Sequence, residues 1–301
     1  MFADMKMTAI FVVYYSSSTL KHQAMISIKN LSFAYKKRPV FDRLNLQFDP
    51  GHVYGLLGKN GTGKSSLLRN IAGLLQPQDG GITVNGFTPF ERLPVFLQDV
   101  FMVPEEFYLP DIPVQAFVDH YAPFYPRFNH NHFRNYITVF EIPADSTLQS
   151  MSYGQKKKVL ISFALATNAK VLLMDEPTNG LDIMSKSQFR KILAEALDEE
   201  RCIIISTHQV KDLENLIDRV TVIDEGKILF DENIEEITKR LSFRFAYDAA
   251  DTETALYSES SLMGHVIVTA NPEREEGKLD LELLYKAIIT NGDKITKLFQ
   301  S

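Results

Sequence analysis

The chain has 301 residues, of which 45% are hydrophobic and 23% are charged, and its formal net charge is −6. This composition is that of a globular protein with a substantial core, and the acidic balance gives no electrostatic reason to expect nucleic acid as a partner. A single cysteine, Cys202, excludes an internal disulfide framework. Because Cys202 lies in an apolar run, we expect it to be a small buried residue and not a reactive thiol.

The first 24 residues form no clear pattern with the rest of the chain. Their apolar stretch, Thr8 to Tyr15, is far too short to span a bilayer and has no obvious cleavage site for a secretory signal. Met25 stands directly before the first convincing strand. We therefore expect residues 1–24 to be an N-terminal extension and Met25 to be the natural start.

The elements that follow alternate between strands and helices. The first strands alternate apolar and polar side chains, and Asp49-Pro50-Gly51 predicts a turn before a short apolar strand and a glycine-rich loop. The order is typical of an α/β fold with a largely parallel sheet. The sequence predicts strands at 26–33, 40–48, 53–57, 82–84, 171–174, 202–206, 220–223, 227–230 and 264–269, and helices at 66–75, 114–121, 130–140, 185–197, 211–217 and 279–289.

Residues 58–65 read Gly-Lys-Asn-Gly-Thr-Gly-Lys-Ser and match the phosphate-binding P-loop pattern in full. Glycines let the backbone curl so that successive N–H groups point at phosphate oxygens, and the following helix adds its positive dipole end. Lys64 is placed to reach the β- and γ-phosphates, and the Ser65 hydroxyl to bind Mg²⁺. The predicted nucleotide-binding residues of this loop are Gly58, Asn60, Gly61, Thr62, Gly63, Lys64, Ser65 and Ser66.

A second motif follows the apolar strand at 171–174, which ends in Asp175 and Glu176. An acidic residue at the end of a strand in a P-loop protein can hold Mg²⁺, and we assign this role to Asp175 together with Ser65. Glu176 then stands beside the γ-phosphate. Its predicted catalytic role is to position and deprotonate the attacking water.

A third motif, residues 151–155, reads Met-Ser-Tyr-Gly-Gln and lies between the two phosphate motifs. Read alone, it predicts a helix capping box formed by Ser152 and Gln155. In this order, the motifs resemble those of the ATP-binding cassette (ABC) family, whose signature is Leu-Ser-Gly-Gly-Gln. The signature match consists of Ser152, Gly154 and Gln155, and the resemblance runs from about residue 26 to residue 241.

The resemblance implies further site residues and a fold. Tyr35 is similar to the aromatic residue that stacks on adenine, His208 to the switch histidine that contacts the γ-phosphate, and residues 179–182 to the loop that joins two nucleotide sites. The implied fold is an α/β P-loop NTPase of ABC type with an antiparallel β-subdomain and a helical subdomain at about 114–165. We expect a nucleotide-binding domain at 25–241 and a small α+β extension of unknown role at 242–301.

Two positions depart from the family pattern. Tyr153 stands in the place of the first signature glycine and limits the freedom of the backbone there. Glu105 aligns with a glutamine that lies near Mg²⁺ and the attacking water; Gln98 takes that place only if the loop is longer. We favour Glu105, whose carboxylate adds negative charge near phosphate and is expected to bind a metal-coordinated water or to raise the Mg²⁺ requirement. Because Gly154 remains, we expect Tyr153 to alter efficiency and not to abolish it. The run at 129–132, Asn-His-Asn-His, has no adjacent acidic or cysteine partner, so we expect an exposed polar loop there and not a metal site.

The resemblance implies an ATPase with ATP and Mg²⁺ as cofactors that closes as a homodimer, or as a pair with a second ABC subunit, when ATP binds. We expect the chain to be cytoplasmic and to power a separate integral membrane permease from the inner face of the cell membrane. One alternative is a soluble ABC ATPase in protein or cluster assembly. Another is a nucleotide-gated binding module with little turnover, which Tyr153 and Glu105 suggest.

Overall fold

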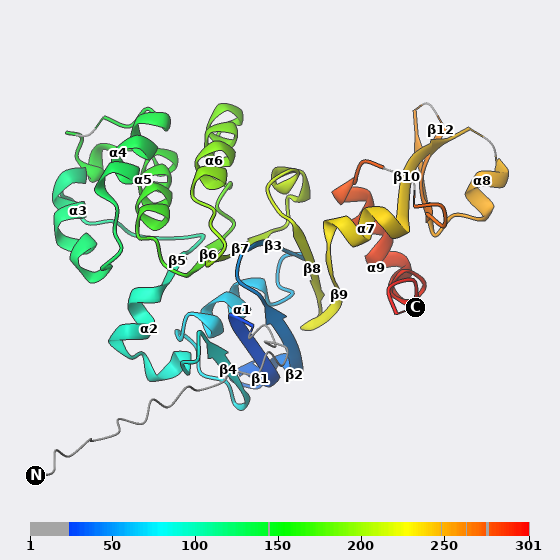
Figure 1. The fold of residues 1–301 in the computed structure, drawn as a ribbon, viewed down its shortest axis with the longest axis horizontal. Coiled ribbons are helices and arrows are strands. Elements are labelled where there is room, and N and C mark those ends of the chain that lie inside the picture. Colours follow the sequence, from blue (N-terminus) through cyan, green and yellow to red (C-terminus); the bar gives the residue numbers. More distant parts are fainter. Residues whose placement is uncertain (1–23, 144, 248, 263, 275–276, 301) are drawn as a thin grey trace, which may run out of the picture.

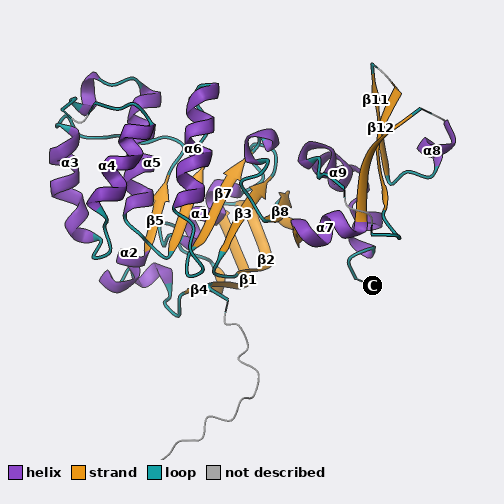
Figure 2. Ribbon diagram, turned by 45° about the horizontal axis from the view of Figure 1, so that its top comes forward, coloured by secondary structure: helices purple, strands orange, loops and turns teal. Residues whose placement is uncertain are grey.

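The computed structural model describes residues 24–300 except 144, 248, 263, 275 and 276. The predicted N-terminal extension, residues 1–24, lies outside the described residues apart from Ala24. The described chain is elongated, with a group of helices at one end, two sheets in the middle and the C-terminal elements, which include a third sheet, at the other end (Figure 1). A view turned by 45° shows the same three parts in the same order (Figure 2).

The described elements alternate between strands and helices, as the sequence predicts. The strands are β1 (Ile26–Tyr35), β2 (Arg38–Phe48), β3 (His52–Leu57), β4 (Asp79–Val84), β5 (Val100–Val103), β6 (Val171–Asp175), β7 (Cys202–Thr207), β8 (Arg219–Asp224), β9 (Lys227–Asn233), β10 (Leu241–Ala246), β11 (Tyr257–Ser261) and β12 (Gly264–Ala270). The α-helices are α1 (Lys64–Ile71), α2 (Pro94–Asp99), α3 (Val114–Tyr121), α4 (His130–Val139), α5 (Tyr153–Ala166), α6 (Ile183–Glu195), α7 (Ile234–Arg240), α8 (Ala249–Glu253) and α9 (Leu281–Lys297). Short 3-10 turns are η1 (Pro89–Glu91), η2 (Ala122–Phe124), η3 (Leu148–Ser150) and η4 (Val210–Leu213).

The central sheet has the strand order β5-β6-β7-β3-β8-β9, in which only β8 and β9 pair antiparallel. Every residue of β6 and β7 is buried, and so is all of β3 except His52. Such burial on both faces explains why these strands read as continuous apolar runs in the sequence. The predicted α/β fold with a parallel-rich sheet is confirmed. Because β3, β6 and β7 are parallel, their carboxyl ends meet at one edge of the sheet.

A second, antiparallel sheet with the order β2-β1-β4 packs on the central sheet. Its strands alternate between buried and exposed positions because one face lies on the core and the other faces solvent. Ile26, Ile28 and Phe48 belong to the same buried cluster as Leu67 and Leu68 of α1. This sheet is the predicted antiparallel β-subdomain.

Helices α3, α4 and α5 form the end of the molecule that lies beyond β5 (Figure 1). A polar side chain fixes where α4 begins. The Asn129 side chain accepts hydrogen bonds from the backbone N–H groups of Asn131 and His132 and so caps α4. The predicted helix at 130–140 therefore begins at His130, and the run 129–132, which we also expected to be an exposed polar loop, is its N-cap and first turn. The two expectations overlap because Asn is common both in loops and as an N-cap residue.

Two predicted helices are shorter in the structure. Helix α1 ends at Ile71, before the predicted end at residue 75, because Gly73 adopts a left-handed conformation with φ of 69°. The predicted helix at 211–217 is only the 3-10 turn η4, because Glu214 is extended and Asn215 has a positive φ of 63°. Apolar spacing alone predicted a longer helix because Leu213, Leu216 and Ile217 are all buried.

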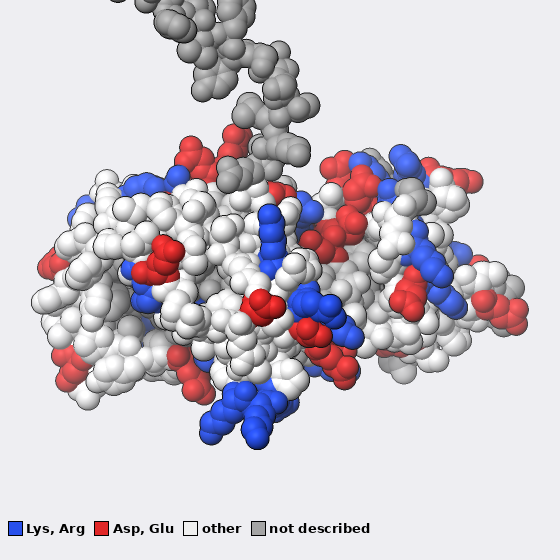
Figure 3. Space-filling model, turned by 90° about the horizontal axis from the view of Figure 1, so that it is seen from below, with Lys and Arg blue, Asp and Glu red and all other residues white. Residues whose placement is uncertain are grey.

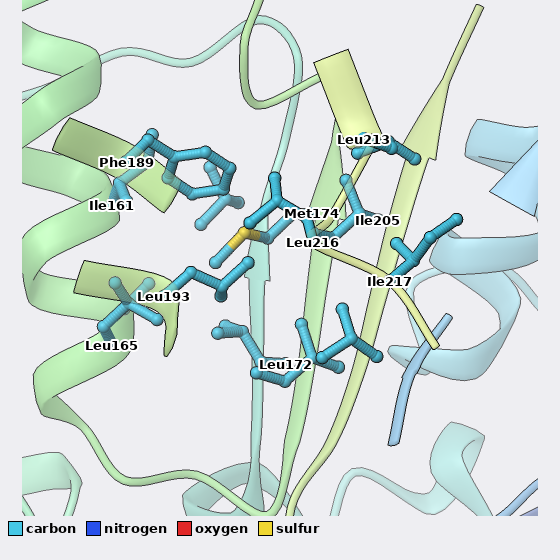
Figure 4. Packing of buried hydrophobic residues seen from close by; sticks show 14 of the residues in the cluster. Ile161, Leu165, Leu172, Met174, Phe189, Leu193, Ile205, Leu213, Leu216 and Ile217 are labelled. Atoms are coloured by element: carbon cyan, nitrogen blue, oxygen red, sulfur yellow. The ribbon is translucent and has the colours of Figure 1, made fainter. Parts of the chain in front are cut away.

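The C-terminal elements form the predicted small α+β unit, in which an antiparallel sheet with the order β10-β12-β11 packs against α9. Leu284, Ala287 and Ile288 of α9 belong to one continuous buried cluster with Leu213 and Val222 of the central part. Figure 4 shows the middle of this cluster, where Leu172, Met174 and Ile205 of β6 and β7 lie near Phe189 and Leu193 of α6. The extension is thus continuous with the main core.

Two further features are the apolar character of the helices and the distribution of charge on the surface. Among the described residues, no helix combines the length and the apolar character needed to cross a bilayer. On the face seen in Figure 3, acidic and basic side chains lie interspersed among uncharged ones, so this face presents both signs of charge side by side.

The continuity of the core predicts that the C-terminal unit and the central part unfold together. Leu284→Ala removes a fully buried side chain and should lower the free energy of unfolding by about 2–5 kcal/mol. Urea unfolding followed by circular dichroism should show this loss in a single transition. Leu262→Ala is the matched control, because Leu262 is fully exposed and its loss should leave the midpoint unchanged. A separate early transition in the Leu284 variant would contradict the shared core.

Candidate nucleotide site

The P-loop connects the end of β3 to the start of α1. Gly63 has a φ of 109°, which L side chains rarely adopt, and a Cβ on Gly58 would lie 2.5 Å from the Ile223 carbonyl oxygen. Gly63 is therefore required by its backbone torsion angle, and Gly58 is required because there is no space for a Cβ atom. Together they let the loop turn tightly above the sheet edge.

Lys64 is the first residue of α1, and its side chain is 5% exposed. Its Nζ donates to the carbonyl oxygens of Gly58 at 2.8 Å and Lys59 at 3.1 Å, and it lies 3.8 Å from Glu176 Oε1. Burial lowers the pKa of the Lys64 ammonium, and the neighbouring carboxylates of Glu176, Asp175 and Glu105 oppose that shift. The Lys64 ammonium thus lies where a phosphate oxygen could replace the loop carbonyl oxygens as its hydrogen-bond acceptor.

Asp175 is the last residue of β6 and is fully buried. Its Oδ1 accepts hydrogen bonds from Ser206 Oγ at 2.6 Å and from Ser65 Oγ at 3.0 Å. Its Oδ2 is also buried, and no group of the described residues donates to it. A buried carboxylate oxygen without a donor, next to a serine hydroxyl, is a donor set that fits a hard divalent cation.

Glu176 follows directly and is 3% exposed. Its Oε1 accepts from the backbone N–H of His208 at 3.0 Å and lies 2.8 Å from His208 Nδ1, while its Oε2 accepts from Thr207 Oγ1 at 3.0 Å. The backbone of Glu176 is left-handed, with a φ of 47°. Residues held in this region are strained unless their surroundings fix them, and such strain is frequent at active sites.

A cavity of about 740 Å³ opens above this edge of the sheet. That volume is within the usual range of small-molecule sites. Most of the predicted nucleotide-binding residues line this cavity, whereas Gly58, Asp175 and His208 are not among its lining residues. The lining residues are Tyr35, Arg38, Pro39, Val40, Asn60, Gly61, Thr62, Gly63, Lys64, Ser65, Ser66, Glu105, Glu176, Glu225 and Gly226.

Tyr35 lines the end of the cavity formed by the first strands. The ring is 43% exposed, packs edge-on against Phe33 at 4.9 Å between ring centroids, and its hydroxyl accepts from Ser66 Oγ at 3.3 Å. An exposed aromatic face at the mouth of a nucleotide-sized cavity is suited to stacking on a base.

The signature residues lie in another place. Ser152, Gly154 and Gln155 line a separate cavity of about 420 Å³ together with Gly180 and Asp182. The Ser152 side chain accepts from the Gln155 backbone N–H while the Gln155 side chain accepts from the Ser152 N–H, so the predicted capping box is confirmed. Within one chain, the signature therefore caps α5 but does not line the cavity of the P-loop.

The two unusual positions, Tyr153 and Glu105, contact each other. The Tyr153 hydroxyl donates to the Glu105 carbonyl oxygen, and its ring stacks on Phe107 at 5.1 Å. The Glu105 carboxylate accepts from Asn179 Nδ2 at 3.1 Å and lines the main cavity. Gln98, the alternative to Glu105, lies in α2 and is not among the residues that line the cavity.

Sequence reasoning missed several residues of the site. Thr207 and Ser206 precede His208 at the end of β7, and their hydroxyls hold the two carboxylates, but buried hydroxyls leave no pattern of their own. Lys157 is fully buried in α5 and donates to the Glu176 carbonyl oxygen at 2.7 Å. A signal was present in the sequence, because Lys157 shares the helical face of the apolar residues Leu160 and Ile161.

The chain is similar in sequence to several known proteins. A family profile described as ABC transporter matches residues 41–179. The methionine import ATP-binding protein MetN of Carboxydothermus hydrogenoformans is 31% identical over 268 residues, which cover 83% of this chain and 78% of the relative. The cobalt import ATP-binding protein CbiO of Salmonella paratyphi A is 32% identical over 229 residues, 68% of this chain and 79% of the relative.

A solved structure agrees with these relatives. CbiO1 of Clostridium perfringens, described as part of the ABC transporter complex CbiONQ, has a TM-score of 0.59 and 26% identity over 71% of this chain and 90% of its own. A buried P-loop lysine, two carboxylates at a strand end and a signature helix on this fold define a nucleotide-hydrolysing cassette. This chain belongs to the family of ABC transporter ATP-binding subunits, and its activity is ATP hydrolysis.

The position of Lys64 predicts its effect on ATP binding. Lys64→Met keeps the length of the side chain and removes the charge, so ATP should bind about 10- to 150-fold more weakly, the range expected for loss of a charged hydrogen bond. Isothermal titration calorimetry with a non-hydrolysable ATP analogue measures this directly. Lys59→Met is the matched control, because Lys59 belongs to the same loop but is exposed and lies outside the cavity lining. Equal affinities for both variants would contradict the assignment.

Proposed function

We propose that this chain is the Mg²⁺-dependent ATPase subunit of a membrane transporter and that it works as a head-to-tail dimer, either with a second copy or with a second ABC subunit. In this proposal residues 25–241 form the nucleotide-binding domain, with the helical subdomain at about 114–165, and residues 242–301 form an extension to it. The observation that carries the proposal is the separation of the two halves of the site. Lys64 and Glu176 line one cavity, while Ser152 and Gly154 line another.

Each group in the cavity has a task that its position supports. In the proposal, the P-loop amides and Lys64 bind the phosphates, Tyr35 stacks on the base, and Glu176 orients the attacking water and accepts its proton. Thr207 and His208 hold the Glu176 carboxylate in place. Ser65 and Asp175 would hold Mg²⁺, which would neutralise charge on the phosphate oxygens.

Dimer formation completes the site in this scheme. The exposed start of α5 offers Ser152, Gly154 and Gln155 to the γ-phosphate on a partner subunit, where the helix end favours negative charge. ATP binding then favours the closed dimer and hydrolysis the open one. Glu105, which lines the cavity beside Lys64, adds a carboxylate near the phosphates and is proposed to modulate turnover.

A permease is the partner that the comparisons support best. The named relatives are import ATP-binding proteins, and CbiO1 is described as part of a complex, which favours a transport role over the assembly alternative. Phe90, Leu93 and Val95 are each at least 43% exposed within six positions of the chain, at η1 and α2. Exposed apolar side chains grouped in this way mark interaction surfaces. We place the cytoplasmic segment of an integral membrane permease here, so that the subunit lies on the inner face of the membrane.

Co-purification tests the transporter assignment. The tagged full chain, extracted from its native membranes in mild detergent, should retain an integral membrane protein in constant stoichiometry. Phe90→Ser together with Val95→Ser should reduce that retention and leave the ATPase activity of the isolated subunit unchanged, because neither side chain lines the cavity. Recovery of the chain alone, or with a soluble assembly protein, would favour the alternative.

Dimer formation is tested separately with Glu176→Gln. This variant keeps the shape of the side chain but cannot accept a proton, so it should bind ATP without hydrolysing it and accumulate as a closed dimer. Light scattering coupled to gel filtration should show a doubled mass in ATP and a monomer in ADP. Adding Ser152→Arg to the same chain should restore the monomer. A monomeric Glu176→Gln protein in saturating ATP would contradict the head-to-tail arrangement.

A further inference from the structure

Lys157 is a charged residue in an unusual place. It lies in the second turn of α5, five residues after the signature serine, and its side chain is fully buried. An ammonium group loses its hydration when it is buried, and such groups are found inside proteins almost always with partners that compensate for the loss. The structure shows one hydrogen bond from Lys157 Nζ, at 2.7 Å to the carbonyl oxygen of Glu176.

The charges around Lys157 are those of the nucleotide site. Burial lowers the pKa of the Lys157 ammonium, and the carboxylates of Glu105, Glu176 and Asp175 oppose that shift. The ammonium also lies 5.8 Å from the centre of the Tyr153 ring, one helical turn earlier. Yet Lys157 does not line either the main cavity or the signature cavity. Its contact with the site is therefore made through the backbone of Glu176.

That backbone is the part of Glu176 that needs support. The residue is left-handed without being glycine, so its conformation persists only where neighbours fix the peptide groups on both sides. The Glu176 N–H donates to the Ser206 carbonyl oxygen at 3.1 Å, and the Glu176 carbonyl accepts from the Asn179 N–H at 3.2 Å as well as from Lys157. Of these partners, Lys157 alone comes from the helix that carries the signature.

We propose that Lys157 is a positioning residue, which sets the direction of the Glu176 side chain by holding its carbonyl group from the signature helix. This inference rests on the proposed role of Glu176 in orienting the attacking water. It also connects two nucleotide sites of a dimer: the start of α5 meets the nucleotide of the partner subunit, and Lys157, on the same rigid helix, holds the carboxylate that acts on the nucleotide of its own subunit.

A substitution that keeps the volume isolates the hydrogen bond. Lys157→Met should lower kcat for ATP by about 10- to 100-fold, the loss expected when a reacting group is displaced by about 1 Å. The KM for ATP should stay the same, because Lys157 does not line the cavity. The midpoint of thermal unfolding should change little, because Met removes the cost of burying an ammonium group and the Glu176 carbonyl oxygen keeps its hydrogen bond from the Asn179 N–H. A purely structural role would lower stability and kcat together.

Two further variants sharpen the test. Lys157→Gln keeps an N–H donor without the charge, and it should recover part of the kcat lost in Lys157→Met. Lys156→Met is the matched control, because the neighbouring Lys156 is partly exposed and should retain the full kcat. Wild-type kcat in Lys157→Met, or a Lys157→Gln variant no faster than Lys157→Met, would overturn the positioning role.

Failure of the inference can be told apart from failure of the proposed function. Glu176→Gln measured in the same assay should lose nearly all turnover. If Glu176→Gln is inactive and Lys157→Met is fully active, the inference alone is wrong. If Glu176→Gln keeps its turnover, the proposed role of Glu176 is wrong and the inference falls with it.

Discussion

Two carboxylates and the ammonium groups of Lys64 and Lys157 are buried together at the carboxyl edge of the central sheet, and the arrangement around them depends on keeping these charges satisfied. Asp175, Glu176 and Lys64 are each at most 5% exposed. Removing an ion from water costs several kcal/mol, so each needs hydrogen bonds and opposite charge in place. The pairing of Asp175 with Ser206 in the β6–β7 register places the Ser206 hydroxyl where it donates to Asp175, and Lys64 supplies the opposite charge beside Glu176. A slip of one residue would turn these side chains to the wrong face.

Most of the fold could be predicted from the sequence because the sheet is buried on both faces. Continuous apolar runs such as 171–174 and 202–206 leave little choice but a central strand, and the P-loop between β3 and α1 fixes one helix start. The wrong predictions concern helix ends, which are set by the local backbone conformation. Gly73 ends α1 early, and Asn215 prevents η4 from continuing as a helix, although the buried apolar residues beyond it keep a helical spacing. The spacing of apolar residues shows which side chains are buried, but it does not show where the backbone adopts a positive φ.

The residues of the candidate site likewise fall into those that the sequence predicts and those that it does not. Residues whose chemistry needs a fixed spacing, such as the P-loop lysine and the paired carboxylates, were predicted from the sequence, and the structure places them at one sheet edge. Residues that act through a single hydrogen bond were missed. Thr207 and Lys157 both hold Glu176, one through its carboxylate and the other through its carbonyl oxygen. These contacts depend on tertiary packing between elements far apart in the chain. The helical spacing can therefore indicate that Lys157 is buried, but it does not show which group Lys157 contacts.

The same packing explains why one signature glycine is replaceable and the other is not. A Cβ on Gly154 would lie 2.8 Å from the Gly180 carbonyl oxygen, a backbone atom that can move only with the loop after Glu176. Tyr153 meets no such obstacle: its ring is 45% exposed and stacks on Phe107. Its hydroxyl also reaches the Glu105 carbonyl, and the Glu105 side chain reaches Asn179. Tyr153 in place of glycine therefore restricts the backbone at the start of α5 and adds a contact with Glu105 in the same chain. This contact joins the signature to the loops around Glu176, the residue that Lys157 also holds from the same helix.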